Sequence, residues 1–278
     1  TLTESELRSL LILLLFALVL VPVAPDEPFG PYGAVNPQSL LRLVLVLMRI
    51  TSAGYVAQRV LSPKLGLVLS GLASGFVSSS ATIAAMGMRA RQDPDQWRAA
   101  AAGALASSIA TVVQYVVVIA AVDVDLIPVI MPNLICAIVA AVLCTGGLAL
   151  TMRGEGGSDR MSRPFHVWMA LGFGAVFVLV TIASSALQER IGNAGIVLVS
   201  GVASIIDAHS TAGSVAALYR TQSIDVDTAR LAILTALSSN TLTKVALALT
   251  GRHKAYAFSV SLGVVIIAVA AWAPLLFS

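Results

Sequence analysis

The sequence predicts an all-α polytopic membrane protein with two pseudo-symmetric four-segment repeats and an extra N-terminal helix. Of its 278 residues, 58% are hydrophobic and 11% are charged, and the mean hydropathy is +0.91. A soluble domain carries about 25% charged residues. Several nearly uncharged runs reach the length of about 20 residues that a helix needs to cross a bilayer. The composition therefore favours a multi-pass protein of a lipid bilayer.

Nine hydrophobic segments follow one another along the chain. They run over Leu7–Val23, Leu40–Val60, Leu65–Met88, Trp97–Val122, Leu126–Met152, His166–Leu187, Ala194–Leu218, Thr228–Thr250 and Tyr256–Phe277. The polar linker Arg153–Arg163 separates two groups of four. We expect a single membrane domain over residues 1–278, with an N-terminal helix and loop (1–38), repeat 1 (39–152) and repeat 2 (166–278).

Two segments 130 positions apart align without a gap. The first runs from Ser70 to Gln92 and the second from Ser200 to Gln222, and both are interrupted by Gly, Ser and other polar residues. In this register, Gln114 corresponds to Lys244. Interrupted hydrophobic segments at matching positions of two halves point to a transporter's binding site.

The basic residues favour a re-entrant hairpin in the third segment. If all nine segments cross the bilayer, the Lys and Arg residues of the connectors divide six against eight between its sides. If the third and seventh segments turn back, the division becomes eleven against three, as the positive-inside rule requires. A hairpin in the third segment alone gives the same division of charges. A hairpin in the seventh segment is therefore inferred only because that segment repeats the third. The two repeats would then be inverted relative to each other.

Straight helices remain the alternative for both segments. Gly71 and Gly75 form the small-xxx-small pattern through which membrane helices pack closely. A break at membrane depth is tolerated only where the backbone is buried or lines a wet cavity. Whether these two segments span the membrane or re-enter is left open by the sequence.

Polar residues inside the hydrophobic segments are the candidates for an ion path at the repeat interface. They are Ser78, Ser79, Ser80, Thr82 and Gln114 in repeat 1, and Asp207, His209, Ser210, Thr211, Asn240 and Lys244 in repeat 2. Such residues usually face a bundle interior or a water path. Asp207 with the Ser210 and Thr211 hydroxyls suits a hard cation, and His209 suits a softer metal or a proton. The structural alternatives are an Asp207–Lys244 ion pair and serine hydroxyls bonded to the preceding turn.

Arg49 lies midway along the second segment, too deep to reach the interface easily. We expect it to have an internal partner, and an anion or a lipid headgroup is the functional alternative. Cys136 and Cys144 are eight residues apart, about 12 Å on a helix, which is too far for a disulfide.

Other function classes lack support. The net charge is +3 and the basic residues are scattered, so a nucleic-acid surface is not expected. The sequence has no Gly-rich phosphate loop after a strand, no zinc-ligand cluster and no hydrolase triad. We therefore expect no enzymatic activity and no cofactor, apart from a bound cation.

Several motifs resemble the DUF4010 membrane domain. They are Asn36-Pro37, Ala53-Gly54-Tyr55, Gly71 to Thr82, Gly201 to Ala208 and Ser239 to Lys244. The resemblance implies that Ser78, Ser79, Ser80, Thr82, Asp207, Asn240 and Lys244 are the family's polar positions. His209 departs from the second acidic residue found in many relatives, which argues against a strongly acidic cation site. The domain often follows an MgtC/SapB-like region, so the resemblance implies a longer parent protein, which fits a chain that opens on Thr1, without naming a substrate.

The sequence thus predicts a transporter or channel for a small ion, most simply a cation, in the bacterial plasma membrane. Two alternatives are a carrier of lipid or lipid-linked substrates, using Arg49, and a regulatory membrane module that transports nothing. Stripes of small residues also allow a homodimer.

Overall fold

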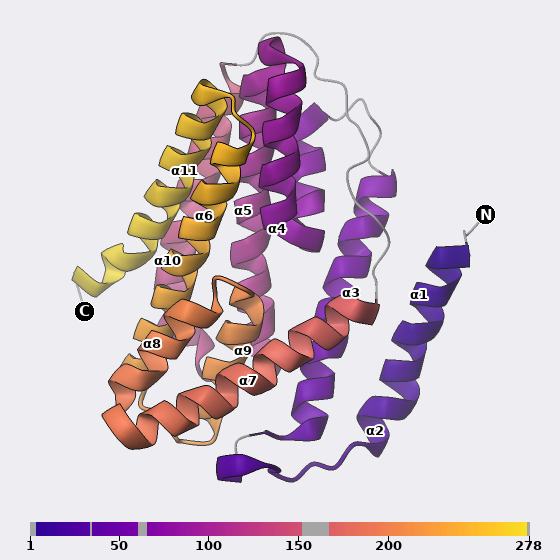
Figure 1. Cartoon of the computed structure of the whole chain (residues 1–278), viewed down its shortest axis with the longest axis vertical. Coiled ribbons are helices and arrows are strands. Elements are labelled where there is room, and N and C mark those ends of the chain that lie inside the picture. The colour runs from indigo at the N-terminus through magenta and orange to yellow at the C-terminus, as the bar shows by residue number, and fades with distance from the viewer. Residues whose placement is uncertain (1–3, 34, 61–65, 152–166, 277–278) are drawn as a thin grey trace. The chain divides into compact units, whose positions relative to one another are not determined.

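The hydrophobic segments form helices. A computed structural model describes residues 4–33, 35–60, 66–151 and 167–276. These residues include no strand, and a single β-bridge joins Phe29 to Val35. The helices (Figure 1) are α1 (Glu4–Leu15), a π-helical turn (Phe16–Leu20), α2 (Val21–Val23), α3 (Pro37–Val60), α4 (Gly66–Gln92), α5 (Trp97–Val122), α6 (Ile127–Ala149), α7 (Val167–Ile191), α8 (Asn193–Ala203), α9 (Ala208–Arg220), α10 (Val226–Thr250) and α11 (Lys254–Trp272), with short 3-10 turns at Pro31–Gly33, Pro94–Gln96 and Ala273–Leu276. The predicted linker Arg153–Arg163 lies outside the described residues.

Seven helices in the described ranges are long and apolar enough to cross a bilayer. They cover Pro37–Ala57, Gly66–Gln92, Pro94–Val122, Ile127–Ala149, Gly172–Ile191, Val226–Thr250 and Lys254–Leu276. The prediction of an all-α polytopic membrane protein is confirmed. Two predicted segments differ from this set: the first is a shorter apolar helix over Leu7–Val23, and the seventh is divided into α8 and α9.

The chain divides into two compact units. Unit 1 comprises Thr1–Arg49, Tyr115–Met131 and Pro164–Asn240, and unit 2 comprises Ile50–Gln114, Pro132–Arg163 and Thr241–Ser278. Both units take residues from both predicted repeats, and the division falls within α3, α5, α6 and α10. Each unit contains one of the two interrupted segments: α8 and α9 belong to unit 1, and α4 belongs to unit 2.

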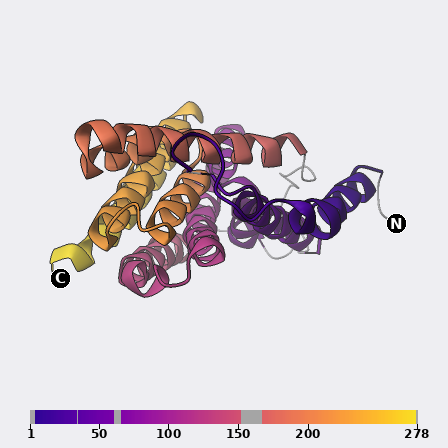
Figure 2. The same ribbon diagram turned by 90° about the horizontal axis from the view of Figure 1, so that it is seen from below.

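Unit 1 packs α7 against both short helices. In Figure 2, α7 lies across α8 and α9, and it contacts each of them. Leu43, Val118 and Phe177 form a buried cluster. Gly213 of α9 faces this cluster so closely that an added Cβ would lie 2.7 Å from Leu43 Cδ2. The lack of a side chain at Gly213 therefore lets α9 reach the core.

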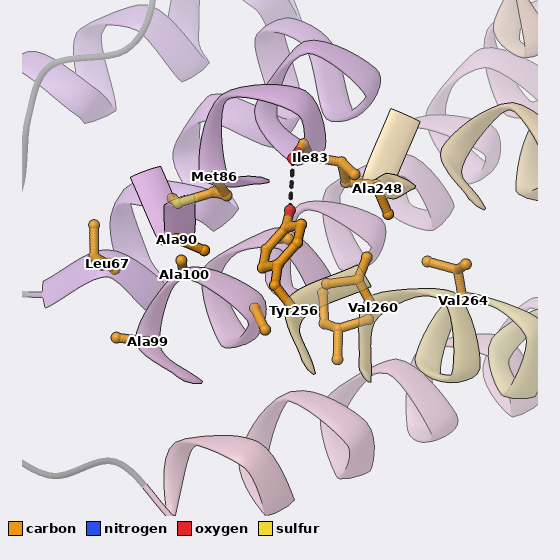
Figure 3. Packing of buried hydrophobic residues seen from close by; sticks show 13 residues of the cluster. Leu67, Ile83, Met86, Ala90, Ala99, Ala100, Ala248, Tyr256, Val260 and Val264 are labelled. Carbon is orange, nitrogen blue, oxygen red and sulfur yellow. Dashed lines mark hydrogen bonds between the residues drawn. The ribbon is translucent and has the colours of Figure 1, made fainter. Parts of the chain in front are cut away.

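Unit 2 is built around the alanine-rich face of α5. Its core cluster combines Leu67, Ile83 and Met86 of α4 with Tyr256 of α11 (Figure 3), and the α5 alanines lie between them. The Tyr256 hydroxyl donates a hydrogen bond of 2.5 Å to the Ile83 carbonyl. Small side chains on α5 permit the close helix packing typical of membrane bundles.

Candidate functional site

The α4 helix is interrupted at Ser78. This residue is extended, with φ −165° and ψ 105°, inside an otherwise helical segment. The hydroxyls of Ser74 and Thr82 are 2.9 Å apart, although residues eight apart lie about 12 Å from each other along a straight helix. The two halves of α4 therefore bend sharply toward each other at Ser78.

The ends of α4 confirm that it folds back. An added Cβ on Gly103 of α5 would lie 2.5 Å from the Leu67 carbonyl oxygen and 2.8 Å from Met86 Cε. In a straight helix, Leu67 and Met86 would be about 28 Å apart. Although α4 has the length of a crossing, its halves lie beside the same residue of α5. We call this element the α4 hairpin.

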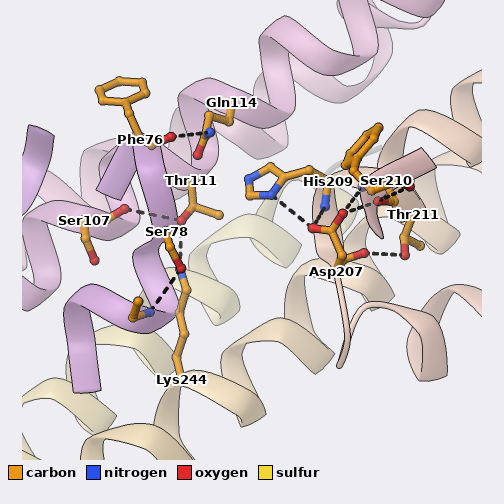
Figure 4. A network of polar contacts seen from close by, with 12 residues as sticks. Phe76, Ser78, Ser107, Thr111, Gln114, Asp207, His209, Ser210, Thr211 and Lys244 are labelled. Carbon is orange, nitrogen blue, oxygen red and sulfur yellow. Dashed lines mark hydrogen bonds and ion pairs between the residues drawn. The ribbon is translucent and has the colours of Figure 1, made fainter. Parts of the chain in front are cut away.

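Side chains satisfy the backbone at this break. The Ser78 hydroxyl accepts a hydrogen bond of 3.2 Å from the Ala81 N–H and so caps the returning half-helix. From α5, Gln114 Nε2 donates to the Phe76 carbonyl at 3.1 Å (Figure 4), and the hydroxyls of Ser79 and Ser107 are 2.9 Å apart. The predicted residues Ser79 and Gln114 therefore hold the hairpin against α5.

The second interruption lies between α8 and α9, at Asp207. This residue is also extended, with φ −150° and ψ 113°. Its carboxylate accepts hydrogen bonds from the backbone N–H groups of His209 at 3.2 Å and Ser210 at 3.1 Å, and also from the Ser210 hydroxyl. The Thr211 hydroxyl donates to the Asp207 carbonyl at 2.9 Å. Asp207 is therefore the N-cap of α9.

The chain turns back at this break, as Figure 1 shows for α8 and α9. With 11 and 13 residues, these helices are about 16 and 20 Å long, which is short of the bilayer core of about 30 Å. Asn193 at the start of α8 donates to the Asp225 carboxylate, beyond the end of α9, at 3.0 Å. We call this element the α8–α9 hairpin. The straight-helix alternative is wrong for both segments.

The two breaks have the same pattern of caps. Ser78 occupies the position of Asp207, because each side chain accepts a bond from the N–H three residues later. Thr82 and Thr211 also correspond, since each donates to the carbonyl of its capping residue. The capping residues are 129 positions apart, so the ungapped register of 130 is one residue off at the break.

His209 lies beside the Asp207 carboxylate. Its Nδ1 is 3.4 Å from Asp207 Oδ1 (Figure 4), so the break brings together two side chains that a straight helix would separate. Its ring packs edge-on against Tyr115, with centroids 5.6 Å apart. His209 Nε2 and the Tyr115 hydroxyl are buried and have no hydrogen-bond partner among the described residues. In the Asp207–His209 pair, His209 Nε2 therefore remains available for a proton or a ligand.

Lys244 is buried in unit 2, with 4% of its surface exposed. Its ammonium donates to the hydroxyls of Thr111 at 3.0 Å and Ser108 at 3.3 Å (Figure 4). Asp207 belongs to unit 1, so the proposed Asp207–Lys244 pair stays a prediction.

The remaining predicted residues have different settings. Ser80 and Asn240 are partly buried, and Asn240 lies in unit 1, whereas Lys244 of the same helix lies in unit 2. Arg49 is exposed on α3, which differs from the expected internal partner. The described residues contain no group of three His, Cys, Asp or Glu that could hold a metal ion. Sequence reasoning missed Tyr115, whose only signal was an aromatic residue beside Gln114 in an apolar run.

Comparison with known proteins agrees with the resemblance. A model of the family described as "Domain of unknown function (DUF4010)" matches residues 44–251. An uncharacterized protein of Aquifex aeolicus is 33% identical over 90 residues, which cover 32% of this chain and 39% of that protein. The aligned part is thus well under half of either protein. No solved structure matches the chain. Because the family model covers most of its length, this chain belongs to the DUF4010 family.

Proposed function

We propose that this protein is a transporter of a small ion in the bacterial plasma membrane, rather than an enzyme. The supporting observation is that both interrupted segments turn back at an extended residue that caps the returning half-helix. Non-helical backbone at membrane depth is tolerated only where it is buried or lines a wet cavity. Broken helices of this kind form the ion sites of several transporter folds.

The α8–α9 hairpin supports a cation, and most simply a proton, as one transported or coupling ion. Asp207 uses its carboxylate oxygens to cap α9 and to face His209 Nδ1. This contact favours the His209 tautomer with its proton on Nδ1, which leaves the lone pair on buried Nε2. His209 Nε2 would take up the proton, and the adjacent carboxylate would stabilise the imidazolium. Asp207 is thus better suited to position His209 than to bind a metal ion itself.

A flux assay tests this proposal. The purified chain is reconstituted in liposomes that contain a pH-sensitive dye, and a pH gradient is imposed with Na⁺, K⁺, Mg²⁺ or chloride on one side. We expect ion-dependent proton movement that His209→Gln abolishes, and that Asp207→Asn reduces by disturbing the position of the ring. His253→Gln is the matched control, because its ring caps α11 and lies in the other unit.

Two results would defeat the proposal. One is wild-type liposomes that are no more permeable than empty ones to every ion tested. The other is proton flux that survives His209→Gln in a folded protein, which would remove His209 from the path.

The lipid carrier remains a second candidate because Arg49 is exposed on α3. An exposed guanidinium in an apolar segment can bind a phosphate headgroup. A scrambling assay with fluorescent phospholipids tests this function, and Arg49→Gln should slow it. Ion flux without lipid movement would reject the lipid carrier.

A further inference from the structure

We infer that unit 2 holds a small monovalent anion at Lys244, with Ser108 and Thr111 of α5 as its neighbours. This inference goes beyond the proton-linked function, because it assigns an ion of opposite charge to a different set of residues. Anion binding at Lys244 depends only on groups of unit 2. Only transport of the anion rests on the proposed function.

Among the described residues of unit 2, no acidic residue within the helices balances the positive charge of Lys244. The acidic residues there are Asp93 and Asp95, which follow α4 in the connection to α5. Asp95 is exposed, and Asp93 accepts a hydrogen bond from Gln96. An ammonium shielded from water is costly unless an opposite charge lies close to it. Hydroxyl groups satisfy its hydrogen bonds without neutralising it.

The hydrogen-bond inventory leaves donors without acceptors at this place. An ammonium has three N–H donors, and Lys244 uses two of them on Thr111 and Ser108. The Thr111 hydroxyl itself donates a hydrogen bond to the Ser107 carbonyl at 3.3 Å. The Ser108 hydroxyl and the third N–H have no acceptor among the described residues. Within unit 2, one hydroxyl proton and one ammonium proton thus remain beside a positive charge that no acidic residue described in this unit balances, and such groups bind an anion.

The size and charge of the ligand follow from these groups. Ser108 and Thr111 are three residues apart and so share one face of α5. With a single ammonium, the site balances one negative charge. It has no guanidinium fork of the kind that recognises phosphate in two places. Chloride, nitrate and bicarbonate belong to the class that fits.

The nearby amide does not belong to this set. Gln114, one turn beyond Thr111, directs its Nε2 to the Phe76 carbonyl of the α4 hairpin. Helix α5 therefore makes two kinds of contact. Gln114 binds the backbone at the break of the α4 hairpin, and Ser108 and Thr111 bind Lys244. An anion at Lys244 would lie on the helix that fixes the hairpin in place.

The test is an anion titration of the whole chain in detergent. The Tm is measured against chloride or nitrate, with gluconate replacing them at constant ionic strength and constant Na⁺. We expect a saturable rise in Tm with either small anion. Lys244→Met should remove the rise. Ser108→Ala should raise the half-saturating concentration about tenfold, since a hydrogen bond to a charged group is lost. Lys254→Met is the matched control, because Lys254 is an exposed lysine of the same unit.

Each outcome decides the inference. It is overturned if wild-type protein responds equally to chloride and gluconate, or if the rise persists in Lys244→Met. Should Lys244→Met fail to fold, an unchanged titration of Ser108→Ala overturns it instead. Because the readout is binding, anion stabilisation without flux would refute only the transport proposal, whereas flux without anion stabilisation would refute only this site.

Discussion

Adding one methyl group at Gly71 should separate the α4 hairpin from α5. A Cβ at this position would lie 2.1 Å from the Gly103 carbonyl oxygen and 2.6 Å from Gly103 Cα. Ordinary contacts begin at 3.4 Å, so the helices must move apart by 3.4 − 2.1, or 1.3 Å. The atoms in the way belong to the backbone, and no change of rotamer can relieve the clash.

The size of the effect follows from two opposing contributions. Overpacking a well-packed interface costs about 1 to 3 kcal/mol. The upper end applies at Gly71, because a gap of up to about 1 Å already loses as much as half of the dispersion energy of the facing atoms. Replacing a helical Gly by Ala returns about 1 kcal/mol. We therefore expect Gly71→Ala to lower the free energy of unfolding by about 2 kcal/mol.

Gly146→Ala isolates the second contribution. Gly146 lies in α6 of the same unit, is exposed, and would place its Cβ more than 4 Å from any atom outside its own helix. This control should stabilise by up to about 1 kcal/mol. Each kcal/mol shifts the Tm of a large domain by about 2 to 4 °C, so Gly71→Ala should melt about 4 to 8 °C below wild type.

Scanning fluorimetry in detergent measures both variants, and the liposome assay shows whether the displaced hairpin still works. The close approach is refuted if Gly71→Ala melts at or above the temperature of Gly146→Ala. A double variant adds a check. Gly75 faces Ser107 at the same interface, with an added Cβ 2.6 Å from Ser107 Cα. Once α4 has moved, Gly75→Ala should cost less than it does alone.

Three further changes test single contacts. Thr82→Val removes the buried hydroxyl that links the halves of α4, and should cost about 1 to 2 kcal/mol. The control Thr243→Val should be neutral, because the buried Thr243 hydroxyl has no partner among the described residues. Equal melting temperatures of the two variants would contradict the link. Tyr256→Phe removes the hydrogen bond to the Ile83 carbonyl and should cost about 0.5 to 1.5 kcal/mol, and an unchanged Tm would exclude that bond. The pKa of Asp225 lies below its usual range because its carboxylate accepts backbone N–H bonds at the start of α10. The stabilisation from Asp225 is therefore present above the unfolded pKa and is lost as pH falls through the folded pKa. Asp225→Asn should flatten this fall of the Tm at acid pH.

A hairpin in the third segment is favoured by the sequence because it changes the side of the membrane on which the basic residues lie. The seventh segment is included only because it repeats the third, and the sequence left straight helices open for both. The residue at which each segment turns was harder to predict from the sequence. An ungapped alignment pairs Val77 with Asp207, whereas the caps pair Ser78 with it. The turn before Asp207 is one residue shorter than the turn before Ser78, counted from the matching residues Ser204 and Ser74. This difference changes no hydrophobic pattern, so the shift is visible only from hydrogen bonds.

Tyr115 and Arg49 show the limits of reading single residues. Tyr115 lies in an apolar run where an aromatic side chain is ordinary, and only the fold brings its ring against His209. Arg49 lies midway along a hydrophobic segment, which predicts an internal partner. Whether a helix position faces the core depends on the neighbours of α3, and these come from distant parts of the chain.

Asp207 and Lys244 differ in how strongly they indicate a bound ligand, because the backbone requires the charge of one and not of the other. A broken helix exposes N–H groups that need acceptors, so a carboxylate at the start of α9 is required by the break itself, whether or not an ion passes. Capping thus accounts for the carboxylate of Asp207, the predicted cation ligand, whereas no backbone group requires the ring of His209. Lys244 satisfies no carbonyl of a helix end, and its ammonium costs free energy where it lies. A charge that the fold does not need is stronger grounds for a ligand than one that it does.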